Sequence, residues 1–330
     1  MNQKIRWGIL GCGRIARKFA ADLKLVNDAE LIAVASRSQN SADEFAKEFP
    51  AKFRHNNYED LAINNEVDVI YIASPHALHY EHVMLCLKHK KAILCEKAFA
   101  INSKQANEMI AFAKTQNVFL MEALWTKFLP HYNVVQKMLR EQKLGTIKSM
   151  QSNFGFIPQA PIPQRLFDPK LGGGALLDIG IYNVFITLSV LGKPDSIEAT
   201  MTPASTGVDE QCAVLFKYNN GALAQLLFTF SSNLATEADI NGDKGRIRLT
   251  SRFYEPSATI EYYPEKIDSK QIIPFDKEGG FGYQYEARHV VECLQKGLTE
   301  SPVMTHNDTL LLMETLDKIR AVAGIHYDVD

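Results

Sequence analysis

The sequence predicts an α/β domain with a doubly wound parallel sheet, followed by an α+β domain with an open, mainly antiparallel sheet flanked by helices. Short buried apolar runs alternate with helical patterns as far as about residue 122. Beyond that point, strand-like runs follow one another and are separated by turn residues. The chain has 330 residues, more than one hydrophobic core usually spans, so we expect two domains, 1–122 and 123–330.

The composition is that of a soluble globular protein, with 46% hydrophobic and 22% charged residues. The formal net charge is −2, from 36 basic and 38 acidic side chains, which gives no electrostatic footprint for nucleic acid or an anionic membrane. The apolar stretch from Ile5 to Leu10 is too short for a secretory signal and contains Arg6. We therefore expect a cytoplasmic protein with neither nucleic-acid nor membrane partners.

The most apolar long stretch, 175–191, resembles a membrane span. It contains Asp178, Gly180 and Asn183 and is short for that role, so it indicates a buried helix. The five cysteines are scattered, odd in number and without a C-x-x-C pair, which favours reduced thiols over a disulfide framework or a zinc site.

Three histidines, His76, His79 and His82, are spaced three residues apart. Such a spacing can place ligands on one helix face, but no thiolate and no H-E-x-x-H pattern accompanies it. Polar helix positions are the favoured interpretation, and no metal is expected.

A glycine turn near the N-terminus indicates nucleotide binding. The apolar strand 5–10 is followed by Gly11-x-Gly13-x-x-Ala16 and a helical pattern to Leu23. Gly11 permits a sharp turn, Gly13 lets the backbone approach a pyrophosphate, and Ala16 lets helix and strand pack closely. The motif is weak alone, but its place between strand and helix predicts a dinucleotide at the helix N-terminus, beside Arg14 and Ile15.

The end of the next strand, 31–35, bears on the choice of cofactor. NAD sites of this kind usually carry an Asp or Glu there for the ribose 2′-hydroxyl, whereas this chain has Ser36-Arg37-Ser38. A hydroxyl and a guanidinium suit a 2′-phosphate, so the sequence predicts NADP over NAD. The alternative is that Arg37 points into solvent.

The remaining elements of the first domain continue the alternation. Strands are predicted near 53 and at 67–73, 92–95 and 118–121, and helices at 41–49 with Ser41 as N-cap, 58–61, 77–87 and 103–115. Ligands of such sheets bind beyond the carboxyl ends of the strands. Ser74, Pro75, Glu96 and Lys97 follow two of these strands.

After residue 122 the pattern changes. A helix is expected to carry Trp125 and Tyr132, and a proline-rich loop to occupy 157–163. Strands are predicted at 147–156, 196–202, 211–218, 223–231, 237–241 and 246–250, and helices from 175, at 283–295 and at 306–323.

Lys97, Asp178 and Tyr182 are the candidate catalytic residues. An ammonium at a strand end can hold a substrate hydroxyl or transfer its proton if its pKa is lowered, and Lys97 and Tyr182 could work as an acid–base pair. Asp178 and Tyr182 are four residues apart, hence on one face of an otherwise apolar helix. The alternatives are a surface Glu96–Lys97 pair and an Asp and Tyr that bond backbone groups in a core.

Trp125, Phe154 and Phe156 could wall a substrate pocket. For each of these aromatic side chains, a place in the core is an equally good interpretation.

These motifs together resemble the glucose-fructose oxidoreductase / inositol dehydrogenase / MocA family. The resemblance rests on Gly11-x-Gly13-x-x-Ala16, Cys95-Glu96-Lys97 and the run 172–182, and it covers nearly the whole chain. The stretch 122–130 and the run 171–182 resemble the branch of dimeric dihydrodiol dehydrogenase and NADP-dependent D-xylose dehydrogenase.

The resemblance implies an N-terminal Rossmann domain and a C-terminal sheet that often forms the subunit interface, hence a homodimer or higher oligomer. It also implies hydride transfer between NADP and a hydroxyl-bearing carbon of a sugar or cyclic diol. By position, Lys97 matches the family's catalytic lysine, Tyr182 stands where many relatives have histidine, and four positions match cofactor-lining residues, namely Ser74, Pro75, His79 and Glu96. The usual Glu-Lys-Pro reads Glu96-Lys97-Ala98 here, which removes the fixed φ of proline next to Lys97.

Two alternatives stay open. A dinucleotide-binding sensor or regulator without catalysis would keep the glycine turn, and the absence of proline at 98 leaves room for it. The sequence also does not separate oxidation of a hydroxyl from reduction of a carbonyl.

Overall fold

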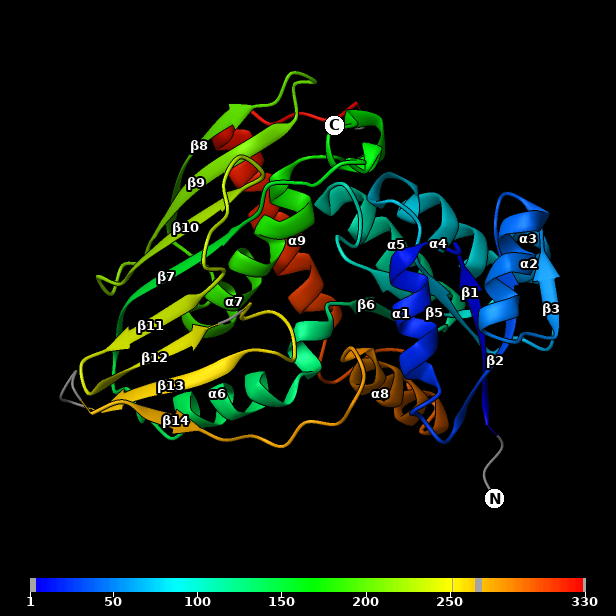
Figure 1. Ribbon diagram of the computed structural model, residues 1–330, viewed down its shortest axis with the longest axis horizontal. Helices are drawn as coiled ribbons and strands as arrows, with labels where there is room; N and C mark the ends of the chain where they lie inside the picture. Colours follow the sequence, from blue (N-terminus) through cyan, green and yellow to red (C-terminus); the bar gives the residue numbers. More distant parts are fainter. Residues whose placement is uncertain (1–3, 251, 265–268, 329–330) are drawn as a thin grey trace. The chain divides into compact units, whose positions relative to one another are not determined.

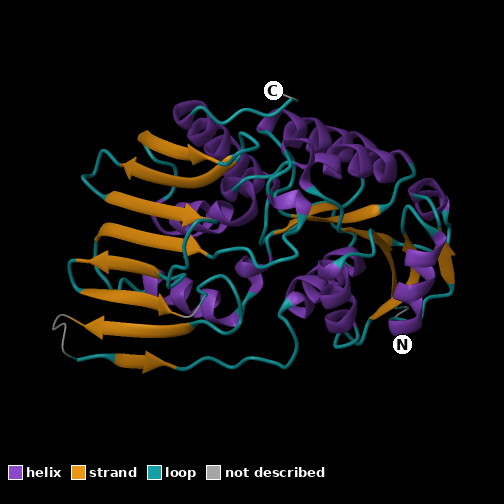
Figure 2. Cartoon of the chain, turned by 45° about the horizontal axis from the view of Figure 1, so that its top comes forward, coloured by secondary structure: helices purple, strands orange, loops and turns teal. Residues whose placement is uncertain are grey.

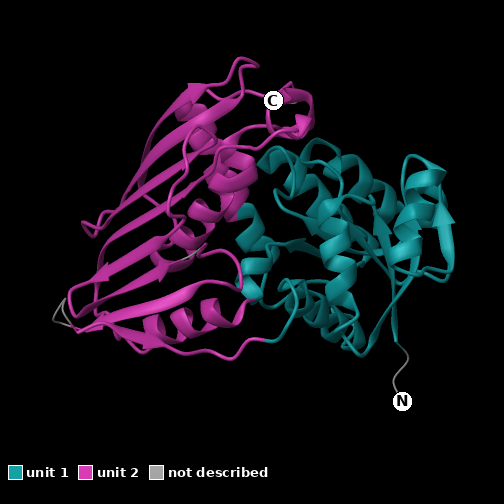
Figure 3. Cartoon of the chain, viewed as in Figure 1, with its two compact units in different colours: residues 1–128, 278–310 teal, residues 129–277, 311–330 magenta. Residues whose placement is uncertain are grey.

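The computed structural model describes residues 4–250, 252–264 and 269–328, which fall into two compact units (Figure 3). The first consists of Met1–Phe128 and Glu278–Leu310, and the second of Leu129–Lys277 and Leu311–Asp330. The first unit therefore takes up a C-terminal segment as well as the alternating N-terminal part. The assignment of 1–122 to cofactor and 123–330 to substrate stays a prediction.

The first unit contains a six-stranded parallel sheet in the order β3-β2-β1-β4-β5-β6 (Figure 1). Its strands are β1 Ile5–Leu10, β2 Ala29–Ala35, β3 Phe53–His55, β4 Val69–Ile72, β5 Ala92–Glu96 and β6 Leu120–Ala123. This is the strand order of a doubly wound dinucleotide-binding sheet, whose switch point lies between β1 and β4. The predicted fold class of the N-terminal part is confirmed.

The helices of this unit are α1 Arg14–Leu23, α2 Gln39–Glu48, α3 Tyr58–Ile63, α4 His79–Lys88, α5 Ser103–Gln116 and α8 Tyr283–Gln295, with short 3₁₀ turns η1 His76–Leu78 and η2 Trp125–Phe128. The predicted N-cap at Ser41 is wrong. Helix α2 begins two residues earlier, because the Ser38 hydroxyl accepts a hydrogen bond from the Ser41 N–H at 3.2 Å.

The predicted single helix carrying Trp125 and Tyr132 is also wrong. Trp125 lies in η2, whereas Tyr132 lies in α6 Pro130–Arg140. Pro130 is the first residue of α6, a position that needs no N–H donor, so the chain starts a new helix there.

The second unit is built on an eight-stranded sheet in the order β14-β13-β12-β11-β7-β10-β9-β8 (Figure 2). Its strands are β7 Ile147–Gly155, β8 Ser196–Pro203, β9 Asp209–Lys217, β10 Leu223–Thr229, β11 Ala238–Gly242, β12 Gly245–Thr250, β13 Thr259–Pro264 and β14 Gln271–Ile273. All neighbours pair antiparallel except β7 and β10, which are parallel. The predicted mainly antiparallel sheet is confirmed, and β13 and β14 were missed.

One face of this sheet is covered by helices. Helix α7 Ile181–Leu191 packs against β7 and β10, and α6 packs against β13 (Figure 1). The approach is close at Gly180, where a Cβ would lie 2.8 Å from the Phe228 ring. Along β9 and β10, buried side chains alternate with exposed or half-buried ones, and β8 has no buried residue, as expected for a sheet with one open face.

The apolar stretch Pro169–Leu191 is long and apolar enough to span a membrane, but 78% of its apolar window is buried inside the fold. It comprises the short turn η4 Pro169–Leu171, a π-helical turn η5 Leu176–Gly180, and α7. The predicted buried helix is confirmed. The last helix is α9 His306–Ala323, and all five cysteines are free.

Candidate functional site

The carboxyl ends of β1, β2, β4 and β5 meet at one edge of the parallel sheet. Leu10 pairs with both Ala35 and Ile72, and Ile72 pairs with Cys95. The residues that follow these strands are therefore neighbours in space. The structure brings together the predicted cofactor residues that follow them, namely Gly11, Gly13, Arg14, Ile15, Ser36, Arg37, Ser74, Pro75, Glu96 and Lys97.

The glycine turn has the shape that a pyrophosphate needs. Gly11 has φ +95°, and a Cβ there would lie 3.1 Å from the Ala73 carbonyl oxygen. Gly13 is the N-cap of α1, and a Cβ there would meet no atom within 4 Å. No side chain caps this helix and its first turn carries no acidic residue. Its N–H groups and dipole are therefore available to an anionic group.

Arg37 lies exposed at the end of β2, next to Tyr58 and His82. Burial raises the pKa of Tyr58 and lowers the pKa of His82 to about 4, and in both cases the positive charge of Arg37 shifts the pKa downward. The preceding residue, Ser36, is anchored because its N–H donates to the His55 carbonyl at 3.1 Å. A cation and a hydroxyl thus stand where an NAD site would need a carboxylate.

Two histidines anchor the chain after β4. His82 Nδ1 lies 2.8 Å from Ser74 Oγ. His79 is fully buried, and its two ring nitrogens lie 2.8 Å from the carbonyl oxygens of Ser74 and Ala98. Burial lowers the pKa of His79 to about 4, so the neutral ring donates to one carbonyl at a time. His79 therefore ties the end of β4 to the residue after Lys97, a role that sequence reasoning did not identify.

Lys97 stands out by its exposure. From Lys91 to Asn102 it is the one residue that is not buried. Its backbone N–H donates to Glu96 Oε2 at 3.2 Å, and the other carboxylate oxygen of Glu96 accepts a hydrogen bond from the Tyr71 hydroxyl. The Lys97–Ala98 peptide is cis although residue 98 is not proline. The lysine side chain is the part of this segment that can reach a ligand.

Helix α8 adds residues to this unit that the sequence did not connect with the site. Asp22 of α1 accepts hydrogen bonds from the N–H groups of Phe281, which precedes α8, and of Tyr283, the first residue of α8. Tyr283 in turn stacks on Trp125 with ring centroids 4.6 Å apart. Trp125, predicted as a pocket wall, is 7% exposed.

Glu286, also on α8, is a fully buried acid. Neither of its carboxyl oxygens has a hydrogen-bond partner among the described residues. Burial, together with the negative charges of Glu96 and Asp22, raises its pKa well above the usual value. The surroundings of Glu286 therefore favour its protonated, uncharged form.

In the second unit, the π-helical turn η5 leads into α7 and carries Asp178. Asp178 Oδ1 accepts a hydrogen bond from Arg165 Nη1 at 2.7 Å. Arg165 lies in the short turn η3 Gln164–Leu166, within the loop after β7. Tyr182, one turn further along the helix, is 6% exposed. Asp178 thus has a cationic partner that the sequence spacing did not reveal.

An aromatic cluster surrounds Tyr182. Tyr254 has its ring centroid 4.6 Å from that of Tyr182 and 4.5 Å from that of Phe154, on which it stacks. Phe156 lies 6.3 Å from Phe154 and packs edge-on against Phe230. Phe154 therefore belongs with Tyr182, while Phe156 lies one layer away. Tyr254 was missed because an isolated tyrosine after a strand carries no distinguishing pattern.

The glycine run before the helix is held by a buried carboxylate. Asp209 of β9 is fully buried, and its Oδ2 accepts a hydrogen bond from the Leu176 N–H at 2.6 Å. Gly174 has φ +120°, and a Cβ there would lie 2.1 Å from Asp209 Oδ1. The Tyr327 hydroxyl donates to the Gly173 carbonyl at 2.8 Å. Only glycine fits at 174 while Asp209 holds the start of the helix that carries Tyr182.

No group of three or more His, Cys, Asp or Glu side chains is placed to hold a metal ion within the described part of the chain. Both ring nitrogens of His79 and the Nδ1 of His82 are occupied by the contacts given above.

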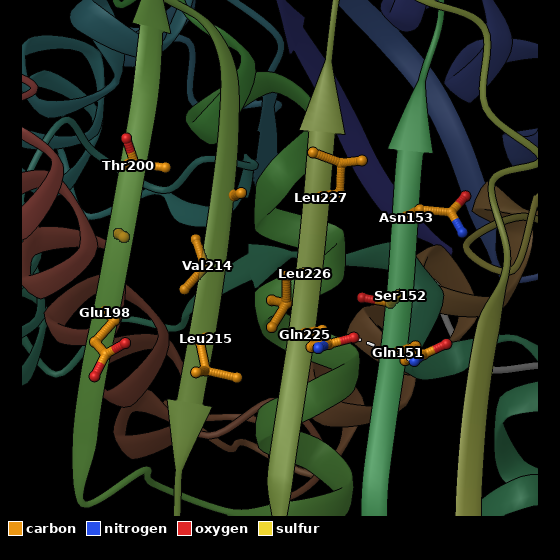
Figure 4. A pocket seen from close by; sticks show the side chains of 12 residues that line it. Gln151, Ser152, Asn153, Glu198, Thr200, Val214, Leu215, Gln225, Leu226 and Leu227 are labelled. Carbon is orange, nitrogen blue, oxygen red and sulfur yellow. Dashed lines mark hydrogen bonds between the residues drawn. The ribbon is translucent and has the colours of Figure 1, made fainter.

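A groove of about 540 Å³ lies on the open face of the eight-stranded sheet (Figure 4). It runs over β7, β10, β9 and β8, between Asn153 at one side and Glu198 at the other. Leu215 and Leu227 contribute apolar surface, and Gln225 is hydrogen-bonded to Gln151. None of the predicted catalytic residues lines it.

The parallel sheet, the uncapped glycine turn and the polar strand ends define a dinucleotide-binding domain of the Rossmann type. The family model of the oxidoreductase family with NAD-binding Rossmann fold matches residues 5–124, and that of the GFO/IDH/MocA C-terminal domain matches residues 132–248. The chain belongs to the glucose-fructose oxidoreductase / inositol dehydrogenase / MocA family of oxidoreductases. The predicted family and the predicted class of enzyme are confirmed.

Two curated relatives extend over almost the whole chain. A trans-1,2-dihydrobenzene-1,2-diol dehydrogenase from Xenopus laevis is 37% identical and covers 98% of this chain and 99% of its own. The enzyme of the same name from Homo sapiens is 34% identical and covers 99% of each chain. The predicted branch of the family is thereby supported by full-length similarity.

A solved structure shares the fold over both units. The 3-ketoreductase from Actinomadura kijaniata, in complex with NADP and TDP-benzene, is 26% identical, with a TM-score of 0.86 over 97% of this chain and 98% of its own. The same ketoreductase has been solved with a lysine replaced by alanine or glutamate and with a tyrosine replaced by phenylalanine.

Proposed function

We propose that this oxidoreductase uses NADP to interconvert a hydroxyl and a carbonyl group on a sugar or a cyclic diol. The observation that carries the cofactor choice is Arg37 at the end of β2, beside Ser36 and with no carboxylate between residues 36 and 38. Support for the substrate class comes from the dihydrodiol dehydrogenases and from the NADP-bound ketoreductase. The nicotinamide, when bound, supplies a hydride acceptor or donor at C4.

The residues proposed to hold the cofactor follow from the first unit. The N–H groups at the start of α1 would bind the pyrophosphate, and the open space at Gly13 leaves room for it. Ser36 and Arg37 would hold the 2′-phosphate. Ser74, Pro75, His79 and Glu96 would support the nicotinamide side, and His79 would do so through the carbonyl groups that it binds.

For the chemistry, we assign proton handling to Lys97 and Tyr182. Each is proposed as a donor or acceptor of the proton on the substrate oxygen, as the resemblance to the family implies. Asp178 would orient the substrate or Tyr182. Trp125, Phe154 and Phe156 are proposed as apolar walls, of which Phe154 is in direct contact with the cluster around Tyr182.

The assignment is tested by Lys97→Met and Tyr182→Phe, assayed with NADP(H) against aldoses, inositols, anhydro-sugars and aromatic dihydrodiols. We expect kcat to fall roughly 10²- to 10⁴-fold in each, which is the contribution of a positioned acid or base. Tyr254→Phe is the matched control, since it keeps the ring of a neighbouring tyrosine. Full turnover by either catalytic variant would disprove the assignment. NADPH binding with turnover of no compound by the wild type would instead favour a sensor.

We also propose that the protein is a homodimer or higher homo-oligomer through the open sheet face. Leu223 and Leu227 are 45% and 36% exposed on β10, an uncommon exposure for leucine in a strand. Leu227→Lys should shift the sedimentation coefficient to that of the monomer. Val322→Lys, at an exposed valine on α9, should not. A wild type that sediments as a monomer at micromolar concentration would refute this proposal.

A cytoplasmic location is proposed from the balanced charge and the scattered free thiols. Fractionation of cells that express the protein tests it, and recovery in the membrane or the medium would count against it.

A further inference from the structure

The ion pair between Arg165 and Asp178 lies at the border between core and solvent in the second unit. The side chain of Asp178 is 11% exposed and that of Arg165 is 36% exposed. Asp178 stands four residues before Tyr182, whose ring belongs to the cluster with Tyr254 and Phe154. A charged donor and a charged acceptor thus sit one helical turn from the proposed catalytic phenol.

Most of the hydrogen-bonding capacity of Arg165 is unused inside the protein. A guanidinium has five N–H donors in a planar fork. Among the described residues, Arg165 donates to Asp178 alone, through Nη1 at 2.7 Å. The remaining donors have no partner among the described residues, and the 36% exposure of the side chain leaves it accessible to a ligand.

The charge of the pair indicates what kind of ligand it accepts. Asp178 compensates the charge of Arg165, so a carboxylate or phosphate that approached the guanidinium would also meet the carboxylate. A neutral hydroxyl meets no such repulsion, because it can accept from Arg165 and donate to Asp178 together. The pair is therefore matched to the oxygen of a neutral polyhydroxylated compound.

We infer that Arg165 is a specificity-determining residue that binds the hydroxyl adjacent to the reacting carbon of the substrate. The inference rests on the proposed function, because Tyr182 must act on the oxygen of that reacting carbon. It narrows the substrate class to vicinal diols, α-hydroxy ketones and sugars with a free neighbouring hydroxyl. A substrate without that hydroxyl leaves the guanidinium donors without a ligand partner. Binding sites discriminate strongly against substrates that lack such a hydrogen-bonding group.

The competing interpretation is a clamp that only fixes the loop after β7. A clamp would matter equally for every substrate, because it would act through the position of Asp178. A direct contact matters only for substrates that carry the second hydroxyl. Comparing substrates therefore separates the two interpretations.

The experiment measures kcat/KM for NADPH-dependent reduction of 2-hydroxycyclohexanone and cyclohexanone by the wild type and by Arg165→Met and Arg165→Lys. Because the enzyme could accept sugars alone, kcat/KM is also measured for oxidation of D-glucose and of 2-deoxy-D-glucose with NADP⁺. In each pair of substrates, one compound carries the neighbouring hydroxyl and the other lacks it. We expect Arg165→Met to lower kcat/KM for the compound with the hydroxyl about 10- to 100-fold, as for a lost hydrogen bond to a charged group. The kcat/KM for the compound without it should stay within about threefold of the wild-type value. Arg165→Lys should recover part of the loss.

Gln164→Met is the matched control, because Gln164 lies in the same turn but bonds Asp168 and not Asp178. Gln164→Met should leave kcat/KM unchanged for both compounds of each pair. An equal loss on both members in Arg165→Met, or no loss on either, overturns the inference while the proposed function stands. A wild type that turns over none of the four compounds and none of the aldoses, inositols, anhydro-sugars and dihydrodiols tested above refutes the proposed substrate class, and this inference with it.

Discussion

Arg37 decides the choice between NADP and NAD at the level of a single side chain. A guanidinium binds a 2′-phosphate through charge-assisted hydrogen bonds, whereas the ribose hydroxyl of NAD gives it no such partner. We expect Arg37→Ala to lower kcat/KM for NADP about 10- to 100-fold and to leave that for NAD nearly unchanged. Steady-state kinetics with both cofactors measure the ratio. Arg54→Ala, at an exposed arginine on the neighbouring strand β3, serves as control and should preserve the preference.

The place of site residues that follow a strand could be predicted from the sequence, because all strands of a parallel sheet have their carboxyl ends at the same edge of the sheet. Lys97 and Arg37 were found in this way. Arg165, Tyr254 and Asp209 could not, because each acts through a contact with a segment far along the chain. Asp209, for example, bonds a backbone group 33 residues away. No local pattern records such a partner.

At the level of elements, the helix that carries Tyr182 depends on β9 for its position. The carboxylate of Asp209 accepts the N–H of Leu176, in the first turn of the π-helical segment. A backbone group at a helix start that lacked this acceptor would be buried without a partner. The orientation of Tyr182 is thus set by a residue from the sheet beneath it.

Asp209 also makes this contact dependent on pH. Burial raises its pKa to about 7, although the N–H groups of Leu176 and Ala175 act in the opposite direction. The folded protein therefore keeps a proton that the unfolded chain releases above about pH 4, so stability falls as pH rises from about 4 to about 7.

Asp209→Asn should remove this dependence, because an amide has no charge to bury. We expect the Tm of the variant, relative to that of the wild type, to be higher at pH 8 than at pH 5. The corresponding change in the free energy of unfolding is several kcal/mol, at about 1.4 kcal/mol per pKa unit. Differential scanning calorimetry at constant ionic strength measures it. A difference in Tm that is the same at both pH values would show that Asp209 is ionised throughout.

Helices and strands could be predicted where buried apolar residues recur with the period of a helix or a strand. The parallel strands β1, β2, β4 and β5 are mostly apolar and buried, and α8 and α9 were predicted with the bounds that the structure shows. The strands β13 and β14 were missed because they form one end of the sheet, where Ile260 is the one fully buried residue of β13 and β14 has three residues. Burial, which produces the periodic pattern, is weakest there.

For the molecule as a whole, two sets of buried groups set the pH dependence of stability in opposite directions. Burial lowers the pKa of three histidines, His79, His82 and His131, to about 4. The folded protein keeps these rings neutral while the unfolded chain binds protons below about pH 6.5. Stability from this set is therefore lost as pH falls from about 6.5 to about 4.

The buried carboxyls act in the other direction. Burial raises the pKa of Glu122 and of Asp209 to about 7, and it raises that of Glu286 well above the usual value of a carboxyl group. Stability from this set is lost as pH rises above about 4. The two sets oppose each other between about pH 4 and 6.5, and above that range only the carboxyls still act, so their combined contribution to stability declines as pH rises towards 7.

Burial and the negative charges of Glu96 and Asp22 raise the pKa of Glu286, so the folded protein holds this proton to a higher pH than the unfolded chain does. Each such proton lowers the free energy of unfolding by about 1.4 kcal/mol per pH unit. We expect the Tm of the wild type to fall between pH 7.5 and 9, and Glu286→Gln, which cannot release a proton, to fall less steeply. Glu292→Gln, at an exposed position on the same helix, should follow the wild type. If Glu286→Gln also follows the wild type in calorimetry, Glu286 is already ionised, and its burial would then require a cationic partner.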